Sequence, residues 1–197
     1  MSLALYALIA LRRDSGFAAE AALKYFVLGA LASGLLLYGI SMVYGATGSL
    51  EFAGVLASSF NEEANEWLLK LGLVFIVVAV AFKLGAVPFH MWVPDVYHGA
   101  PTSVTALVGT APKVAAVVFA FRILVTGLGT VHHDWSLMFA LLAAASLLVA
   151  TLPPSCRPIS NVCSPIPPYR IWALSCWRLW QARSALRRVS ITPLPTR

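Results

Sequence analysis

Long apolar runs separated by short polar segments make up most of this chain. A transmembrane helix needs about 20 apolar residues, and four of the runs reach that length. They cover residues 17–44, 67–87, 102–126 and 135–152. A further run at 1–11 is about half as long as a span requires. The pattern predicts an all-α integral membrane protein, a bundle of about four full transmembrane helices with a partial one at the N-terminus.

The segment 88–101 is apolar in composition but is interrupted by glycine and proline. Pro88 has no N–H group, and its ring clashes with the carbonyl group of Leu84 if the helix continues. We therefore expect a discontinuous helix near residues 83–88. The other connections are a turn at 12–16, a glutamate-rich loop at 45–66 and a short link at 127–134.

Composition supports the membrane assignment and divides the chain in two. Hydrophobic residues make up 59% and charged residues 11%, whereas a soluble domain has roughly 25% charged residues. All eight acidic residues lie at or before Asp134, while seven of the fourteen basic residues and all three cysteines follow residue 151. The net charge of +6 is therefore no sign of a nucleic-acid partner, and we expect a lipid bilayer around 1–151. Residues 152–197 form a second region.

Lys113 is the strongest candidate for chemistry because it lies near the middle of a predicted span. Its ammonium group would have to travel roughly 15 Å to leave the bilayer, which exceeds the reach of a lysine side chain. Pro112 removes a backbone donor beside it and can kink the helix. Burial favours the neutral amine, which suits proton exchange; a lysine paired only for structure is the alternative.

Lys83 lies about one turn before the expected helix break. A break beside a charged residue exposes carbonyl groups that can hold water or a cation. The alternative, which the residues favour equally, is a lysine at a helix C-terminus whose ammonium group reaches the interface.

Other polar residues have less specific patterns. Glu20 and Lys24 are four apart with the acid first, which favours either an interfacial salt bridge or a role in ion movement. His90 lies in the broken segment, where it is either a proton relay or a hydrogen-bonded structural residue. Asp95 and His98 are predicted to be loop and helix-cap residues.

Signals of metal or cofactor binding are weak. His132, His133 and Asp134 are adjacent in sequence, so they rarely point at one ion, and no cysteine accompanies them. The sequence contains no glycine-rich phosphate loop, no paired CxxC motif and no HExxH motif. We expect neither a metal nor a cofactor site in this chain.

The candidate lysines lie in a recognisable sequence block, FKLGAVPFHMWVPDVYHGAPTSVTALVGTAPKVAA, which begins at Phe82. This block closely resembles the N subunits of bacterial NADH–quinone oxidoreductase, respiratory complex I. The PDVYHGAP stretch and the TAPKVAA context of Lys113 distinguish it from the sister subunits M and L. The stretch AAEAALKYFVLGALASGLLLYG is similar to the same family, and the resemblance extends from residue 1 to about residue 151.

The resemblance implies an antiporter-like subunit in the membrane arm of the complex, in the bacterial inner membrane. Such a subunit couples electron transfer from NADH to quinone to proton translocation. The resemblance further implies that Lys83 gates proton transfer at the broken helix, that Lys113 relays protons, and that Lys24 has a lesser role. Its partners would be the other membrane-arm subunits. NADH, FMN, iron–sulfur clusters and quinone would bind to other subunits, which leaves no catalytic redox site in this chain.

Two departures from the family pattern affect these expectations. The family pattern reads ELMSLALY where this chain begins with MSLALY, so the acidic partner of the gating lysine is expected to be absent. After residue 151 the family pattern stops, but codons chosen to encode 152–164 give AAIVQTNLKRML when they are read from the third base of the first codon. We therefore expect 152–197 to be an out-of-frame tail. A truncated, non-functional product and a small stand-alone cation or proton transporter are the alternative interpretations.

Overall fold

The structure is a computed structural model that describes residues 2–12, 14–58 and 65–151. All regular elements in these ranges are helical, which confirms the predicted all-α membrane bundle. They are α1 (Ser2–Ile9), α2 (Gly16–Thr47), α3 (Phe52–Ser58), α4 (Glu66–Leu84), α5 (Trp92–Gly99), α6 (Thr102–Phe121), the π-helix η1 (Arg122–Gly127) and α7 (His132–Thr151). The predicted out-of-frame tail lies outside the described residues and stays a prediction.

Four helical segments are long and apolar enough to cross a membrane. They are Gly16–Thr47, Glu66–Leu84, Thr102–Gly127 and His132–Val149, close to the four predicted spans. Large apolar side chains such as Leu23, Leu31 and Val118 are exposed on the outer faces of these helices, where a bilayer or a neighbouring helix can cover them. The chain is a multi-pass membrane protein.

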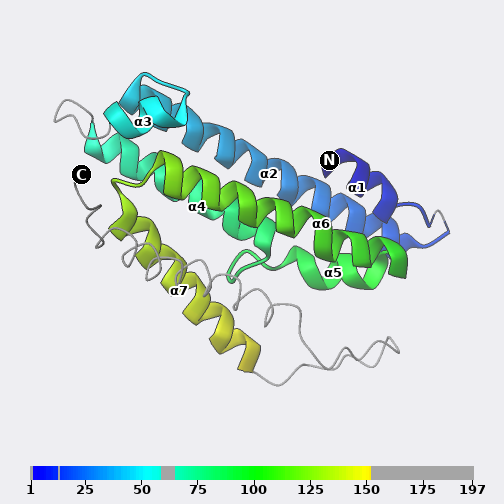
Figure 1. The fold of residues 1–197 in the computed structure, drawn as a ribbon. Helices are drawn as coiled ribbons and strands as arrows, with labels where there is room; N and C mark the ends of the chain where they lie inside the picture. The colour runs from blue at the N-terminus through cyan, green and yellow to red at the C-terminus, as the bar shows by residue number, and fades with distance from the viewer. Residues whose placement is uncertain (1, 13, 59–64, 152–197) are drawn as a thin grey trace, which may run out of the picture.

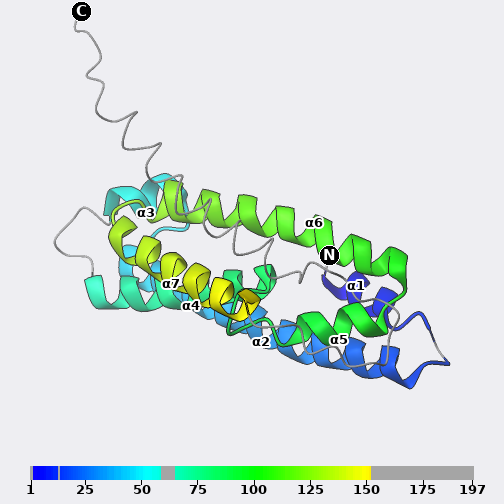
Figure 2. The same cartoon turned by 90° about the horizontal axis from the view of Figure 1, so that it is seen from below.

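Helices α2, α4 and α6 run side by side and form the body of the bundle (Figure 1). Helices α1 and α5 lie at one end of this body and α3 lies at the other, as both views show (Figures 1 and 2). Helix α7 packs against α4, contacts the broken segment through Ser146, and lies at an angle to the other long helices (Figure 1). The broken segment between α4 and α6 lies along one side of this body, where its helix α5 packs against α2 and α6 (Figure 1).

Glycines allow α2 to approach its neighbours closely. A Cβ atom added at Gly39 would lie 2.9 Å from the carbonyl oxygen of Gly72, and one added at Gly72 would lie 2.9 Å from the carbonyl oxygen of Gly39. A Cβ atom at Gly99 would lie 2.9 Å from the carbonyl oxygen of Phe17. Small residues of this kind permit backbone contact between membrane helices. Helices α4 and α5 are thus both fixed against α2.

The helix break is present, but it comes earlier than the predicted clash at Pro88. Helix α4 ends at Leu84, and Gly85 follows with φ of 72°, a left-handed conformation that glycine adopts without a Cβ penalty. The Ala86 N–H group donates to the carbonyl oxygen of Ala81 at 2.9 Å and closes the helix end. The chain then turns into the short helix α5 before α6 begins at Thr102.

Two local predictions need correction. The loop predicted at 45–66 contains the short helix α3, whereas the predicted span 102–126 is confirmed and its last part is the π-helix η1. Asp95 and His98 lie inside α5 rather than in a loop, and Asp95 pairs with Lys24 instead of capping a helix. The reason is that α5 packs against α2, which brings a basic side chain close to the Asp95 carboxylate.

Candidate functional site

Lys113 on α6 is completely buried, with 0% of its surface exposed, although it carries an ionisable amine. Its Nζ atom donates a hydrogen bond to the hydroxyl oxygen of Tyr97 at 2.8 Å. The same atom lies 5.3 Å from the centre of the Tyr97 ring and 5.9 Å from the centre of the Trp92 ring. The distance to Trp92 suits attraction between a cation and an aromatic face, whereas the contact with Tyr97 is made through its hydroxyl group. The structure therefore supplies this lysine with a polar and aromatic environment.

The residues around Lys113 come mainly from the broken segment. Tyr97 and Trp92 belong to α5, which the helix break places next to α6. The phenol of a tyrosine, whose ordinary pKa is about 10, stays protonated near neutral pH. A protonated phenol can accept a hydrogen bond from an ammonium group and can also donate one.

Trp92 connects α5 to the broken end of α4. Its Nε1 atom donates to the carbonyl oxygen of Phe82 at 3.1 Å, and its ring stacks on that of Tyr25 with 4.8 Å between centres. Phe82 immediately precedes Lys83, so the bond fixes α5 against the turn that carries this second lysine. The indole thus positions the surroundings of both Lys113 and Lys83.

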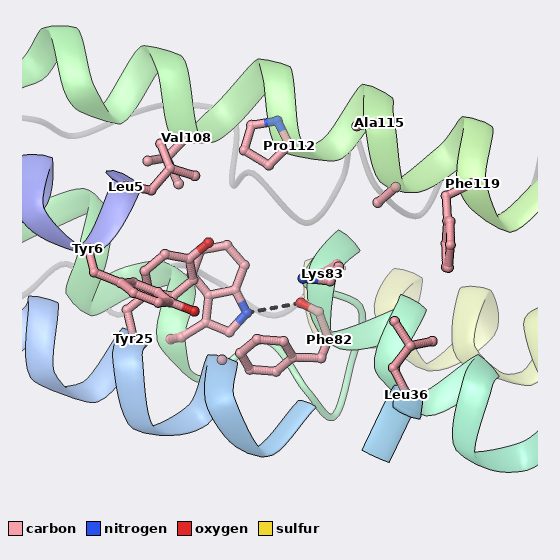
Figure 3. A pocket seen from close by; sticks show the side chains of 13 residues that line it. Leu5, Tyr6, Tyr25, Leu36, Phe82, Lys83, Val108, Pro112, Ala115 and Phe119 are labelled. Carbon is pink, nitrogen blue, oxygen red and sulfur yellow. Dashed lines mark hydrogen bonds between the residues drawn. The ribbon is translucent and has the colours of Figure 1, made fainter. Parts of the chain in front are cut away.

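A cavity of about 370 Å³ lies between α1, α2, α4 and α6 (Figure 3). Its lining is mostly apolar and aromatic, and Lys83 contributes an amine to it. Pro112, the residue before Lys113, also lines the cavity. In Figure 3 the Lys83 side chain lies close to the carbonyl group of Phe82, at the point where α4 ends. The half-buried Lys83 therefore lines a partly open cavity between the helices.

Lys24 lies outside this cavity, in a cluster with two carboxylates. Its Nζ atom is 2.7 Å from Glu20 on the same helix and 3.0 Å from Asp95 on α5. The Lys24 side chain is 46% exposed. The predicted Glu20–Lys24 salt bridge is confirmed, and Asp95 extends it to a neighbouring helix.

The remaining candidates lie elsewhere. His90 is partly exposed in the turn between α4 and α5, and its role as a relay stays a prediction. His132 and Asp134 lie at the start of α7, where Asp134 is 3.8 Å from Lys70 on α4. The structure thus brings Lys113 and Lys83 to one region and separates Lys24 from it.

Sequence reasoning missed several residues that complete the site. Tyr97 is the hydrogen-bond partner of Lys113, and Trp92 holds the broken segment. The buried Ser146 on α7 accepts a hydrogen bond from the Val87 N–H group at 3.1 Å, which satisfies the backbone just after the break. The sequence did offer one indication of such residues: a break in a membrane helix leaves backbone N–H and C=O groups without partners in the helix, and polar side chains must then form hydrogen bonds with them.

Comparison with known proteins gives a consistent picture. The sequence model of the family described as "NADH:quinone oxidoreductase/Mrp antiporter, TM" matches residues 1–153. NADH-quinone oxidoreductase subunit N of Neisseria gonorrhoeae is 97% identical over 152 residues, which are 77% of this chain and 32% of that protein. The subunit N of Laribacter hongkongensis is 64% identical over 152 residues, 77% of this chain and 31% of that protein. The chain thus spans about a third of the length of the curated relatives it matches.

Two solved structures share the fold. A chain of the membrane-bound sulfane sulfur reductase, an archaeal respiratory membrane complex, matches with a TM-score of 0.66 and 29% identity, covering 91% of this chain and 35% of that one. A chain of respiratory complex I from Thermus thermophilus matches with a TM-score of 0.62 and 32% identity, covering 91% of this chain and 36% of that one.

Proposed function

This chain belongs to the NADH:quinone oxidoreductase/Mrp antiporter transmembrane family, and we propose that it forms part of a proton-translocating subunit of bacterial respiratory complex I. In this role it lies in the bacterial inner membrane and contacts other membrane-arm subunits. Electron transfer from NADH to quinone takes place elsewhere in the complex. NADH, FMN, iron–sulfur clusters and quinone bind to other subunits.

The observation that carries the proposal is the complete burial of Lys113 with its amine on the Tyr97 hydroxyl. A charged group inside a membrane protein is costly, so a structural span has no reason to retain one. An amine in such a place can take up and release a proton, while the phenol remains as a partner. Lys113 is therefore proposed to hold the proton at an intermediate point of its passage.

Lys83 provides the second proton-binding group. It lies at the end of α4, beside carbonyl groups that the break leaves outside a regular helix. It also lines the cavity that reaches Pro112, next to Lys113 in the chain. The cavity is large enough to hold several water molecules, each of which takes about 30 Å³ in the liquid. Water there would contact the Lys83 amine, and Trp92, which also lines the cavity, separates it from the buried Lys113 amine 5.9 Å from the indole ring.

The test uses the full-length subunit within its complex. Residues 1–151 of this chain replace the matching segment of the Neisseria gonorrhoeae subunit N, and inner-membrane vesicles are prepared. NADH-driven acidification is followed with a pH-sensitive dye, and NADH:quinone reduction is measured on the same vesicles. We expect Lys113→Ala to lower the initial rate of acidification at least about tenfold, since a positioned proton-transfer group contributes that much or more.

Lys70→Ala is the matched control. Lys70 is also a lysine in a span, but it is 40% exposed and pairs with Glu66 at 2.6 Å, away from the cavity residues. This variant should acidify the vesicles at the rate of the parent. Wild-type acidification by Lys113→Ala, at equal amounts of assembled complex, would reject the proposed role of Lys113.

A further inference from the structure

The short helix α5 packs against α2 and α6, and a hydrogen bond from Trp92 joins it to α4, so it touches all three helices that carry the candidate lysines. One polar side chain of α5 is directed to each of α2, α4 and α6. The contacts are Asp95 to Lys24 at 3.0 Å, Trp92 to the carbonyl oxygen of Phe82 at 3.1 Å, and Tyr97 to Lys113 at 2.8 Å. A single element of eight residues therefore connects an exposed ion pair to the buried amine.

We propose that Tyr97 is the positioning residue of Lys113, and that Asp95 acts on Lys113 through Tyr97. The Asp95–Lys24 ion pair holds α5 at the depth and rotation that keep the phenol on the amine. This inference rests on the proposed role of Lys113 and names the residues that make its geometry.

The packing of Tyr97 along α6 supports the first part. A Cβ atom added at Gly109 would lie 3.3 Å from the Tyr97 hydroxyl oxygen. Gly109 is four residues before Lys113, so both lie on the same face of α6. The phenol thus fits over a glycine and ends on the amine of the next turn. A side chain at residue 109 would compete for the space that the hydroxyl occupies.

The chemistry of a phenol suits an amine that changes its charge. The Tyr97 hydroxyl accepts a hydrogen bond when Lys113 is an ammonium, and it can donate one to the lone pair when Lys113 is a neutral amine. A carboxylate could only accept. Because a tyrosine phenol has an ordinary pKa of about 10, it keeps its proton near neutral pH and remains available in both states. Tyr97 therefore holds the Nζ atom in place throughout a proton-transfer cycle.

The contacts of α5 with α2 support the second part. A Cβ atom on Gly99 would lie 2.8 Å from the Cβ atom of Ala21, so the end of α5 has little freedom against α2. The Asp95–Lys24 pair fixes the same two helices one turn earlier. Loss of this pair leaves α5 free to rotate by a small amount, and Tyr97 moves with it. The effect on Lys113 should then be smaller than that of removing the hydroxyl.

The first experiment compares Tyr97→Phe with Tyr38→Phe in the vesicle assay described above. Tyr97→Phe removes one oxygen and leaves the ring, so the complex should assemble. We expect the alkaline limb of the acidification rate against pH to move lower by up to about one pH unit, because the phenol bonds more strongly to the ammonium than to the neutral amine. Tyr38 is an exposed residue of α2 whose ring contacts Phe75 of α4, so Tyr38→Phe should leave the profile unchanged. An unchanged profile for Tyr97→Phe overturns the positioning role.

The second experiment tests whether Asp95 acts through Tyr97. Asp95→Asn should shift the same limb in the same direction by less, and adding it to Tyr97→Phe should shift the limb no further. Additive shifts overturn the claim for Asp95. Gly109→Ala, which displaces the hydroxyl without removing it, should give an intermediate shift and serves if Tyr97→Phe does not assemble. Loss of acidification in Lys113→Ala with parent behaviour in all three other variants would overturn this inference alone and leave the proposed function standing.

Discussion

The contact between α2 and α4 yields a prediction whose size follows from the structure. Replacing Gly72 by alanine adds a Cβ atom 2.9 Å from the Gly39 carbonyl oxygen, 3.0 Å from Cγ2 of Val43 and 3.2 Å from Cβ of Met42. The first of these partners is backbone and cannot move without shifting α2. Overpacking of this kind costs about 1–3 kcal/mol. We therefore expect Gly72→Ala to lower the free energy of unfolding.

Gly34→Ala on α2 is the matched control. A Cβ atom at Gly34 would meet no heavy atom within 4 Å among the residues that the structure describes. Both substitutions replace a helical glycine by alanine, so they share the same gain in helix propensity of about 1 kcal/mol. Their difference isolates the steric cost and should be about 1–3 kcal/mol, with Gly72→Ala the less stable variant.

The assay is unfolding of the purified full-length subunit in mixed micelles with increasing SDS, followed by circular dichroism. The midpoint and slope for each variant give the free energy difference. Equal stability of Gly72→Ala and Gly34→Ala, within about 0.5 kcal/mol, would refute the close approach of α2 and α4.

Two further substitutions test local contacts with the same unfolding assay. Ser146→Ala removes the acceptor of the Val87 N–H group and should lower the free energy of unfolding by about 1–3 kcal/mol. Ser33→Ala, whose hydroxyl bonds only to the Gly29 carbonyl oxygen within α2, should lower it by less. Equal losses would count against the bond between the broken segment and α7. Asn65→Ala removes the side chain that accepts from the Leu68 N–H group at the start of α4 and should cost about 0.5–2 kcal/mol, while Asn65→Asp should retain stability; a neutral Asn65→Ala would argue against this cap.

The spans were predictable because a bilayer imposes a length and an apolar composition on every crossing helix. The four predicted runs agree with the four long helices to within a few residues at most ends. The sequence predicted where the helix α4 breaks, but it did not predict which residue ends the helix. Pro88 gave the visible signal, whereas the helix ends at Gly85, whose left-handed conformation depends on the packing of the following turn.

Apart from Glu20, which the i,i+4 spacing predicted, the partners of Lys24 and Lys113 could not be predicted, because they depend on tertiary contacts. Asp95 and Lys24 are 71 residues apart, and only the packing of α5 on α2 brings them together. Tyr97 and Lys113 are 16 residues apart, but the turn between α5 and α6 sets the direction of the phenol. A sequence pattern shows that a buried amine needs a partner and leaves open which residue provides it.

The central claim is that Lys113 must release its proton as well as hold it. Lys113→Arg tests this most directly, because arginine keeps the positive charge and its guanidinium does not lose its proton in proteins. The measurement is the rate of NADH-driven acidification per assembled complex in inner-membrane vesicles. We predict that Lys113→Arg acidifies the vesicles as poorly as Lys113→Ala. Acidification at the parent rate by Lys113→Arg would show that a fixed charge suffices and would contradict the account.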